Sequence, residues 1–577
     1  MTAGDRQRRA DAADALCSAA FADARTGPDP RGVALVAVGG YGRRELAPHS
    51  DLDLVLVHAR DVDVSELAAR VWYPLWDAGV DLDHAVRALP EVAAAAGADV
   101  RVALGLLDAR HVAGDPTVTL RLRTDLLAEW RRGARDRLPA LHALVASRGR
   151  RVGELAHVAV PDLKESTGGL RDATVLKALV ATWLVDVPHT DLERCRRRLL
   201  DVRDVLHEVA GRSTDRVGPE LWGDLAAGLG LADGAAAQRH VRETGRRVTH
   251  LSRLTWRRVA SVSVTDRLTT RGRSATLARS PGRERRPVLD PVAPGLAVSA
   301  GEVVLDAAAQ PAAEPLLLLR AAAEAAERDL VLAPATAARL ARECPDVAEP
   351  WASDGRNLLV RLLASGPGLL AVWETLDETG ALARLLPEWE RVRLLPHASS
   401  VHRYTVDRHL VETCVEASRL TRRVGRPDVL LVTALLHDIG KGGDLDHCVA
   451  GEPLAVAISE RLGFAVRDIE LIGRLVRHHL LLAEVATTRD LRDSDTLEHV
   501  AERVVDVDTL TLLAVLTEAD ARATSARAWS AWRAGLVADL TRRVRAELSA
   551  DAVRSRRRHG DGGGGGCTTE AGRPGYP

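Results

Sequence analysis

Apolar residues in the N-terminal part of the chain follow the pattern of an α/β fold. Residues 32–38 form a continuous apolar run that ends in a glycine-rich turn, which predicts a buried strand. A second strand is expected at 52–58, an amphipathic helix at 65–77 and a third strand at 80–88. We therefore predict an α/β domain over residues 1–120.

The rest of the chain is dominated by helical spacing. Its 577 residues are too many for one hydrophobic core, so several domains are expected. We predict a helical connecting domain at 121–270 and a flexible insert, rich in Arg, Pro, Gly and Ala, at 271–314. Helical periodicity returns at 315–546, where most histidines cluster, and a disordered tail follows at 547–577. The fold class is thus a multidomain α+β protein.

Composition narrows the classes of function. Hydrophobic residues make up 46% and charged residues 28%, which is typical of a globular protein. The net charge of -1 provides no field that would attract DNA. No window reaches about 18 uninterrupted apolar residues, so no membrane association is expected. The N-terminus has no apolar signal segment and the six cysteines form no CxxC pair, which favours a cytoplasmic protein with reduced thiols.

A pair of carboxylates marks the first candidate site. Asp51 and Asp53 are two positions apart on a predicted strand, so both side chains project from one face. Carboxylate oxygens together with substrate phosphates are the ligands that Mg²⁺ prefers. Asp81 on the third strand is our expected further catalytic carboxylate, with Asp83 in reserve. The alternative for these last two residues is an acidic edge strand.

The glycine-rich turn upstream of this pair is suited to binding phosphate. Its glycines let backbone N–H groups approach a phosphate closely, an arginine can add positive charge and a serine can add a hydroxyl contact. The candidate nucleotide-binding residues are Gly39, Gly40, Gly42, Arg43 and Ser50, with Arg44 as an alternative cation.

Residues 39–54 read G-G-Y-G-R-R-E-L-A-P-H-S-D-L-D-L. This string resembles the nucleotidyltransferase signature of the bifunctional uridylyltransferase and uridylyl-removing enzymes that act on PII signal proteins. The resemblance implies a polymerase-β-like domain that uses Mg²⁺ and transfers UMP from UTP to a tyrosine of PII. The chain departs from the family on the third strand, where Asp83 and Ala85 stand in place of the usual Gly and Ser.

Residues 161–172 read P-D-L-K-E-S-T-G-G-L-R-D and resemble a second segment of the same family. Two roles are open for this segment. Its residues either position a phosphate or fix the turn between two domains.

Histidines and aspartates mark a second candidate site on separate helical segments. His437 and Asp438 are adjacent, so they can share a metal ion only with partners from neighbouring helices, for which His409 and Asp520 are the candidates. Imidazole and carboxylate ligands suit a divalent transition metal or a mixed Mg²⁺ or Mn²⁺ site. Accessory residues that complete a second metal or contact phosphate are expected to be Lys441, His447, His478 and His479.

This spacing resembles the HD phosphohydrolase pattern, and residues 516–524, L-T-E-A-D-A-R-A-T, resemble the last ligand region of the uridylyl-removing domain. The resemblance implies an all-α HD domain at about 385–540. It also implies that the metal ligands are His409, His437, Asp438 and Asp520.

Three alternatives to a uridylyltransferase and uridylyl-removing enzyme stay open. The Ala- and Arg-rich, Lys-poor composition suggests a high-GC bacterium, and the resemblance leaves open an enzyme of such bacteria that uses ATP to adenylylate PII. A tRNA CCA-adding or poly(A) polymerase-like enzyme also combines these domains, but the near-zero net charge counts against it. A binding module without turnover is the third. The family implies glutamine regulation through C-terminal ACT domains, which we expect to be missing from this chain.

Overall fold

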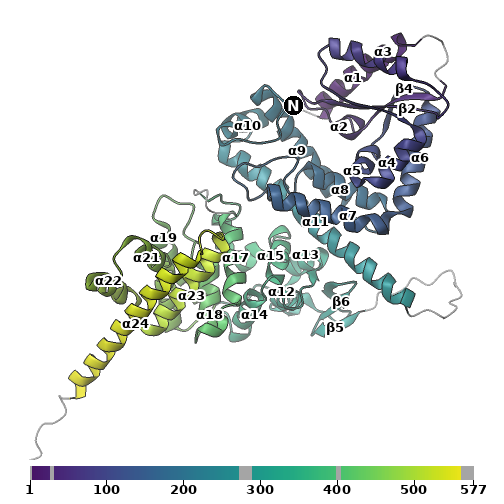
Figure 1. The fold of residues 1–577 in the computed structure, drawn as a ribbon. Coiled ribbons are helices and arrows are strands. Elements are labelled where there is room, and N and C mark those ends of the chain that lie inside the picture. Colours follow the sequence, from purple (N-terminus) through teal and green to yellow (C-terminus); the bar gives the residue numbers. More distant parts are fainter. Residues whose placement is uncertain (1–2, 26–30, 272–288, 398–403, 561–577) are drawn as a thin grey trace, which may run out of the picture. The chain divides into compact units, whose positions relative to one another are not determined.

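The computed structural model describes residues 3–25, 31–271, 289–397 and 404–560, and Figure 1 shows a largely helical chain with small sheets. Contacts divide it into two compact units. Unit 1 contains residues 1–291 and 297–302, and unit 2 contains residues 292–296 and 303–577. The expected fold class, a multidomain α+β protein, is confirmed. The predicted insert and tail lie partly outside the described residues.

Unit 1 begins with a mixed four-stranded sheet in the order β3-β2-β1-β4. The strands are β1 (Val33–Ala37), β2 (Leu52–His58), β3 (Leu82–Ala88) and β4 (Arg110–Gly114). Strand β1 is antiparallel to β2 and β4, whereas β2 and β3 are parallel. The β2–β3 register pairs Asp53 with Asp83.

Both faces of this sheet are covered. All five residues of β1 are buried, with Leu35 in one hydrophobic core and Val36 in another on the opposite face. One face packs against α1 (Ala3–Asp23) and α3 (Ser65–Asp77), seen beside the sheet in Figure 1. The opposite face packs against α4 (Leu89–Ala98), α5 (Val100–Leu106) and α6 (Pro116–Arg132).

Helices complete unit 1 and extend its second core. They are α7 (Ala134–Val152), α8 (Leu170–Ala181), α9 (His189–Ala210), α10 (Trp222–Leu229) and α11 (Gly234–Arg271). Between α7 and α8 the chain makes only isolated bridges, such as Glu154 with Thr167. The residues between Val152 and Leu170 therefore form a loop.

A second four-stranded sheet, in the order β5-β6-β7-β8, follows residue 289. Its strands are β5 (Asp290–Ala293), β6 (Leu296–Ser299), β7 (Glu302–Leu305) and β8 (Val331–Leu332). The first helices of unit 2 are α12 (Leu317–Glu327), α13 (Pro334–Glu343), α14 (Ser353–Ala364), α15 (Gly368–Glu378) and α16 (Ala381–Leu385). In the described ranges no single helix is long and apolar enough to cross a membrane, although the bent pair α14 and α15 meets that test jointly by length and composition.

The C-terminal part of unit 2 is a helical bundle around α18 (Pro427–Leu436). Residues Val429–Leu436 are buried without exception, as expected for a helix that is apolar on all sides. Helix α18 contacts α17 (Val406–Ser418), α20 (Val466–Arg477) and α23 (Val507–Thr524). The remaining helices are α19 (His447–Arg461), α21 (Leu481–Thr488), α22 (Ser494–Val504) and α24 (Ala531–Gly560).

Candidate functional site

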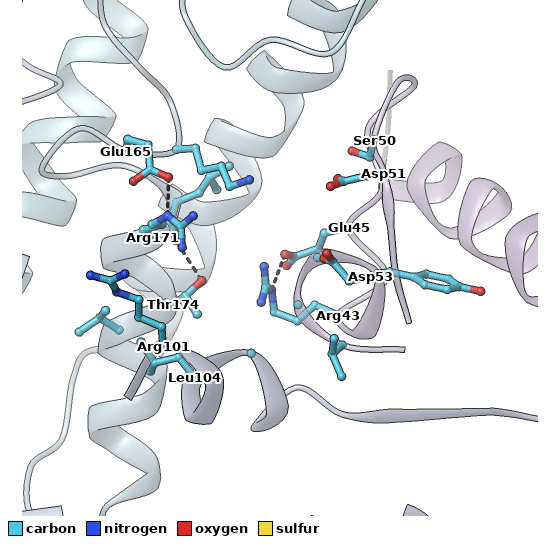
Figure 2. Close-up of a pocket in the computed structure, with 18 of the residues that line it drawn as sticks. Arg43, Glu45, Ser50, Asp51, Asp53, Arg101, Leu104, Glu165, Arg171 and Thr174 are labelled. Atoms are coloured by element: carbon cyan, nitrogen blue, oxygen red, sulfur yellow. Dashed lines mark hydrogen bonds and ion pairs between the residues drawn. The ribbon is translucent and has the colours of Figure 1, made fainter. Parts of the chain in front are cut away.

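A cavity of about 790 Å³ in unit 1 is the first candidate site. One wall is formed by the short helix α2 (Gly39–Gly42) and the start of β2, and the other by α5, α7, α8 and the loop before α8. Figure 2 shows Asp51 and Asp53 on one side and Arg101, Glu165 and Arg171 on the other. The sequence-predicted residues Gly39, Gly40, Arg43, Ser50, Asp51 and Asp53 all line this cavity.

Three carboxylates gather at the sheet end of the cavity. Asp51 directly precedes β2, Asp53 lies within it, and the parallel register places Asp83 beside Asp53. Burial, followed by the charges of Asp51 and Asp83, raises the pKa of Asp53 to about 6, while Lys164 and Arg43 oppose this rise. Such crowding of negative charge is what a divalent cation would relieve.

The structure changes the choice of the third carboxylate. Asp81 was the expected residue, but it precedes β3 and is not among the cavity-lining residues, whereas Asp83 is. The reason is the register of the parallel strands, which brings residue 83 rather than residue 81 level with Asp53.

At two positions in α2 the neighbouring atoms lie so close that only glycine fits. Gly39 has a φ of +56°, and a Cβ on it would lie 2.7 Å from Asp53 Oδ2. A Cβ on Gly42 would lie 2.3 Å from the backbone oxygen of Asp108. Gly42 therefore lets α2 pack against the chain before β4, and Gly39 lets α2 begin directly over the Asp53 carboxylate.

Neither arginine after the glycine turn is a free cation. Arg43 lines the cavity, but its guanidinium donates to Glu45 at 2.8 Å and to Asp108 at 2.5 Å. Arg44, expected as the alternative cation, donates instead to Asp11 and Asp14 of α1 and does not line the cavity. Sequence reasoning therefore missed the role of Arg43 as part of an ion-pair network.

Positive charge without a carboxylate partner comes from the opposite wall. Arg101 of α5, Arg151 of α7 and Lys164 line the cavity, and within the described ranges no ion pair is found for them. Lys164 is close enough to Asp53 to lower its pKa. The cavity thus has acidic groups on one wall and uncompensated cations on the other.

The loop that carries Lys164 is rigidly fixed. Asp172 is buried, pairs with Arg148 and accepts from the Gly168 N–H at 2.7 Å. Gly168 has a φ of +87°, and a Cβ there would lie 2.3 Å from the Gly245 oxygen. Glu165 accepts from Arg171 at 2.5 Å, as Figure 2 shows. The end of this segment is therefore pinned, and Lys164 faces the cavity. Its role in binding phosphate stays a prediction.

The second candidate site lies in the helical bundle of unit 2. His409 Nε2 lies 3.0 Å from Asp520 Oδ1, and His437 Nε2 lies 3.8 Å from the same oxygen. These three ligand atoms lie within 4.8 Å of one another, a spacing compatible with one metal ion. Helix α17 supplies His409 from its first turn, α18 ends just before His437, and Asp520 comes from within α23.

Backbone contacts orient these imidazoles. His437 Nδ1 lies 3.0 Å from the Ala434 oxygen, so the proton resides on Nδ1 and the Nε2 lone pair faces the cluster. Burial lowers the pKa of His437 to about 4, which keeps its ring neutral near pH 7. His437 Nε2 and Asp438 Oδ1 are buried without a hydrogen bond, which suits a metal site.

Asp438 connects this group to the accessory residues. Its Oδ2 lies 2.5 Å from Lys441 Nζ, and its Oδ1 lies 3.4 Å from His447 Nε2 and 3.5 Å from His479 Nε2. Among the described residues His478 belongs to neither potential metal-ligand group. The structure therefore brings seven of the eight predicted residues of this site together and leaves His478 outside.

Two neighbours of this site were not predicted. His397, before α17, lies 3.3 Å from Lys441 Nζ and 5.4 Å, centroid to centroid, from the ring of His409. Cys448 Sγ lies 3.7 Å from His447 Nε2 and 3.7 Å from His479 Nδ1. The ligands expected from the sequence include no thiolate, although Cys448 directly follows His447.

Comparison with known proteins finds two family matches. The GlnD PII-uridylyltransferase family matches residues 140–256, and the HD domain family matches residues 406–524. The second match contains the whole ligand cluster of unit 2. The first contains the loop of Lys164 but begins after the Asp51 and Asp53 pair.

Curated relatives extend over most of the chain, and each carries the name bifunctional uridylyltransferase/uridylyl-removing enzyme. The Streptomyces coelicolor protein is 50% identical over 90% of this chain and 62% of its own length. The Mycobacterium tuberculosis protein is 42% identical over 91% and 65%, and the Corynebacterium glutamicum protein is 35% identical over 87% and 70%. The chain thus spans somewhat less than two thirds of the first two relatives.

Proposed function

Because the chain belongs to the family of bifunctional uridylyltransferase/uridylyl-removing enzymes, we propose that unit 1 transfers UMP from UTP to a PII signal protein and that unit 2 hydrolyses the product. The observation that carries this proposal is the presence of two separate clusters, one of carboxylates facing cations in unit 1 and one of histidines and aspartates in unit 2. Carboxylates that face cations suit a metal-bound triphosphate, whereas histidines with aspartates suit a metal ion that activates water.

In the transfer step a tyrosine hydroxyl of PII attacks the α-phosphate of UTP, a new O–P bond forms, and pyrophosphate leaves. Asp51 and Asp53 would hold Mg²⁺, which supplies charge neutralisation at the phosphates when bound. Asp83 is placed to complete this carboxylate set or to accept the tyrosine proton. Gly39 and Gly40 leave room for the triphosphate next to these carboxylates.

Charge complementarity supports a nucleoside triphosphate as the substrate. Lys164, Arg101 and Arg151 face the carboxylates across a cavity large enough for a nucleotide. A magnesium-bound triphosphate would place its metal against the acidic wall and its distal phosphates against these cations. UTP rather than ATP is inferred from the name of the relatives, not from any contact with a base.

In the hydrolytic step water attacks the phosphorus of the tyrosyl-UMP linkage, the tyrosine oxygen leaves with a proton, and UMP is released. His409, His437, Asp438 and Asp520 would hold Mg²⁺ or Mn²⁺, which lowers the pKa of bound water when present. Lys441, held by Asp438, is placed to contact the phosphate. His397 beside Lys441 restricts the position of that ammonium group.

A labelling assay tests both activities at once. The full chain is incubated with purified PII, Mg²⁺ or Mn²⁺, and α-labelled UTP or ATP. We expect label from UTP on PII, loss of labelling in Asp53→Asn, and retained labelling with slow release in His437→Ala. Labelling from ATP alone would replace UMP transfer by adenylyl transfer, and extension of tRNA without labelling of PII would overturn the proposal.

A further inference from the structure

Cys448 is the one described cysteine that is not buried, and it lies next to the hydrolytic cluster. Its Sγ is 3.7 Å from His447 Nε2, and His447 Nε2 is in turn 3.4 Å from Asp438 Oδ1. The potential ligand atoms of His447, Cys448 and His479 lie within 4.8 Å of one another. This group is separate from the His409, His437 and Asp520 group but shares Asp438 as a neighbour.

These separations match those of ligands around one tetrahedral ion. With Zn–S near 2.3 Å and Zn–N and Zn–O near 2.0–2.1 Å, tetrahedral angles place N and S about 3.6 Å apart and N and O about 3.4 Å apart. The observed distances are 3.7 Å for Cys448 Sγ to His447 Nε2, 3.4 Å for His447 Nε2 to Asp438 Oδ1 and 3.5 Å for His479 Nε2 to Asp438 Oδ1. These three pairs of atoms already have the spacing of ligands on one ion.

A ring nitrogen of His479 and a carboxylate oxygen of Asp438 face each other in this group. His479 Nδ1 lies 2.8 Å from the Val476 oxygen, so the proton resides on Nδ1 and Nε2 is left facing Asp438. Asp438 Oδ1, between His447 and His479, is buried and accepts no hydrogen bond. A buried carboxylate oxygen without a hydrogen bond is costly unless another partner, such as a cation, occupies the site.

Close packing at Gly440 and the cap of α19 hold Cys448 near Asp438. A Cβ on Gly440 would lie 2.2 Å from the His447 oxygen and 2.4 Å from the Gly451 nitrogen, so glycine lets α19 approach the chain after Asp438. Asp446 caps α19 by accepting from the Cys448 and Val449 N–H groups. The first turn of α19 is thereby fixed against the Asp438 carboxylate.

We propose that Cys448, His447, His479 and Asp438 form a second metal position in the hydrolytic site, with the thiolate as a ligand. A thiolate among the ligands selects a zinc-class transition ion over Mg²⁺, which prefers oxygen ligands. The two positions share Asp438, as in two-metal hydrolytic sites where ions lie about 3.5–4 Å apart. The inference rests on the proposal that this cluster is a metal centre.

Cobalt substitution tests the thiolate directly, because sulfur bound to Co²⁺ gives a near-ultraviolet charge-transfer band that nitrogen and oxygen ligands do not give. The metal-free chain of 577 residues is titrated with Co²⁺, and bound ions are counted by elemental analysis. We expect the band to grow with the ion at the second position, to disappear in Cys448→Ser, and to persist in Cys344→Ala, whose thiol is buried at the end of α13.

A second measurement uses the unaltered protein. Zn²⁺ should protect Cys448 from alkylation by iodoacetamide, read by peptide mass spectrometry, whereas Mg²⁺ should not. Absence of the charge-transfer band in the unaltered protein, or an unchanged band in Cys448→Ser, would overturn the thiolate ligand. If Co²⁺ still binds through His409, His437 and Asp520, the proposed hydrolytic metal centre survives that outcome.

Discussion

Gly39 lies directly against Asp53: a Cβ on the glycine would be 2.7 Å from Oδ2 of the aspartate. The φ of Gly39 is also positive, at +56°. Glycine at this position therefore leaves room for the Asp53 carboxylate, the proposed metal ligand, and also allows the backbone turn that begins α2. This contact makes a substitution at residue 39 a direct probe of the transfer site.

Gly39→Ala should reduce UMP transfer at least tenfold and leave hydrolysis unchanged. The left-handed conformation costs an alanine about 1–2 kcal/mol, and its methyl group would displace the Asp53 carboxylate. Transfer to PII and release from labelled PII are measured separately. Gly105→Ala is the control, because Gly105 lines the same cavity with open space around its Cβ position. Equal effects of both substitutions would contradict the proposed contact.

Lys164→Ala should raise the KM for the nucleoside triphosphate more than it lowers kcat. A charge-assisted hydrogen bond to phosphate contributes about 1.5–3 kcal/mol, so kcat/KM should fall by roughly 10- to 100-fold. The matched control is Lys177→Ala, since Lys177 pairs with Glu193 at 2.7 Å and does not line the cavity. Steady-state kinetics with varied UTP gives both constants. An unchanged KM in Lys164→Ala would remove this residue from triphosphate binding.

The Mg²⁺ requirement of transfer should depend on pH around 6. The pKa of Asp53 is raised to about 6 by burial and by Asp51 and Asp83, so this carboxyl is neutral below that pH and charged above it. Protons therefore compete with Mg²⁺ at low pH, and the Mg²⁺ concentration for half-maximal transfer should rise up to about tenfold per pH unit below 6.

Lys164 provides the internal check of this pH dependence. Its charge lowers the pKa of Asp53, so Lys164→Ala should move the midpoint to higher pH. Transfer is measured at several Mg²⁺ concentrations between about pH 5 and 7.5. A Mg²⁺ requirement that is flat across this range would show that Asp53 is not the titrating ligand.

Local elements were predictable where the hydrophobic pattern is regular. The ranges 52–58 and 65–77 agree residue by residue with β2 and α3, because each has a clear period and a defined end. Strand β4 was missed because Arg110–Gly114 is short and contains Arg and His. It exists through pairing with β1, which is a tertiary effect that local propensity does not contain.

The chemistry of the sites was predictable in residue type but not in geometry. The preference for Asp81 over Asp83 depended on a parallel register that one sequence does not reveal. Likewise, nothing in the sequence indicates that Arg43 pairs with Asp108, which is 65 residues away. The approach of Cys448 to Asp438 depends on how α19 packs at Gly440, which only the folded chain determines.

His478 and His479 provide the sharpest test of the hydrolytic site, because they are adjacent but occupy different environments. His479 Nε2 lies 3.5 Å from Asp438 Oδ1. Among the described residues, His478 belongs to neither group of potential metal ligands, and burial together with Arg503 and Arg477 lowers its pKa to about 4. His479→Gln should reduce uridylyl removal more than about 100-fold, beyond the 10- to 100-fold typical of residues that only support ligands. His478→Gln should reduce it less than about tenfold, since it removes no ligand.

Transfer to PII should be unchanged in both histidine variants, because their site is in unit 2 and the transfer cavity is in unit 1. Release of labelled UMP from modified PII and bound metal per chain are measured together. A ligand role predicts that His479→Gln loses metal as well as activity, whereas a purely structural role would lower thermal stability with metal still bound. Equal losses of uridylyl removal in His478→Gln and His479→Gln would show that the distinction between these two side chains is wrong.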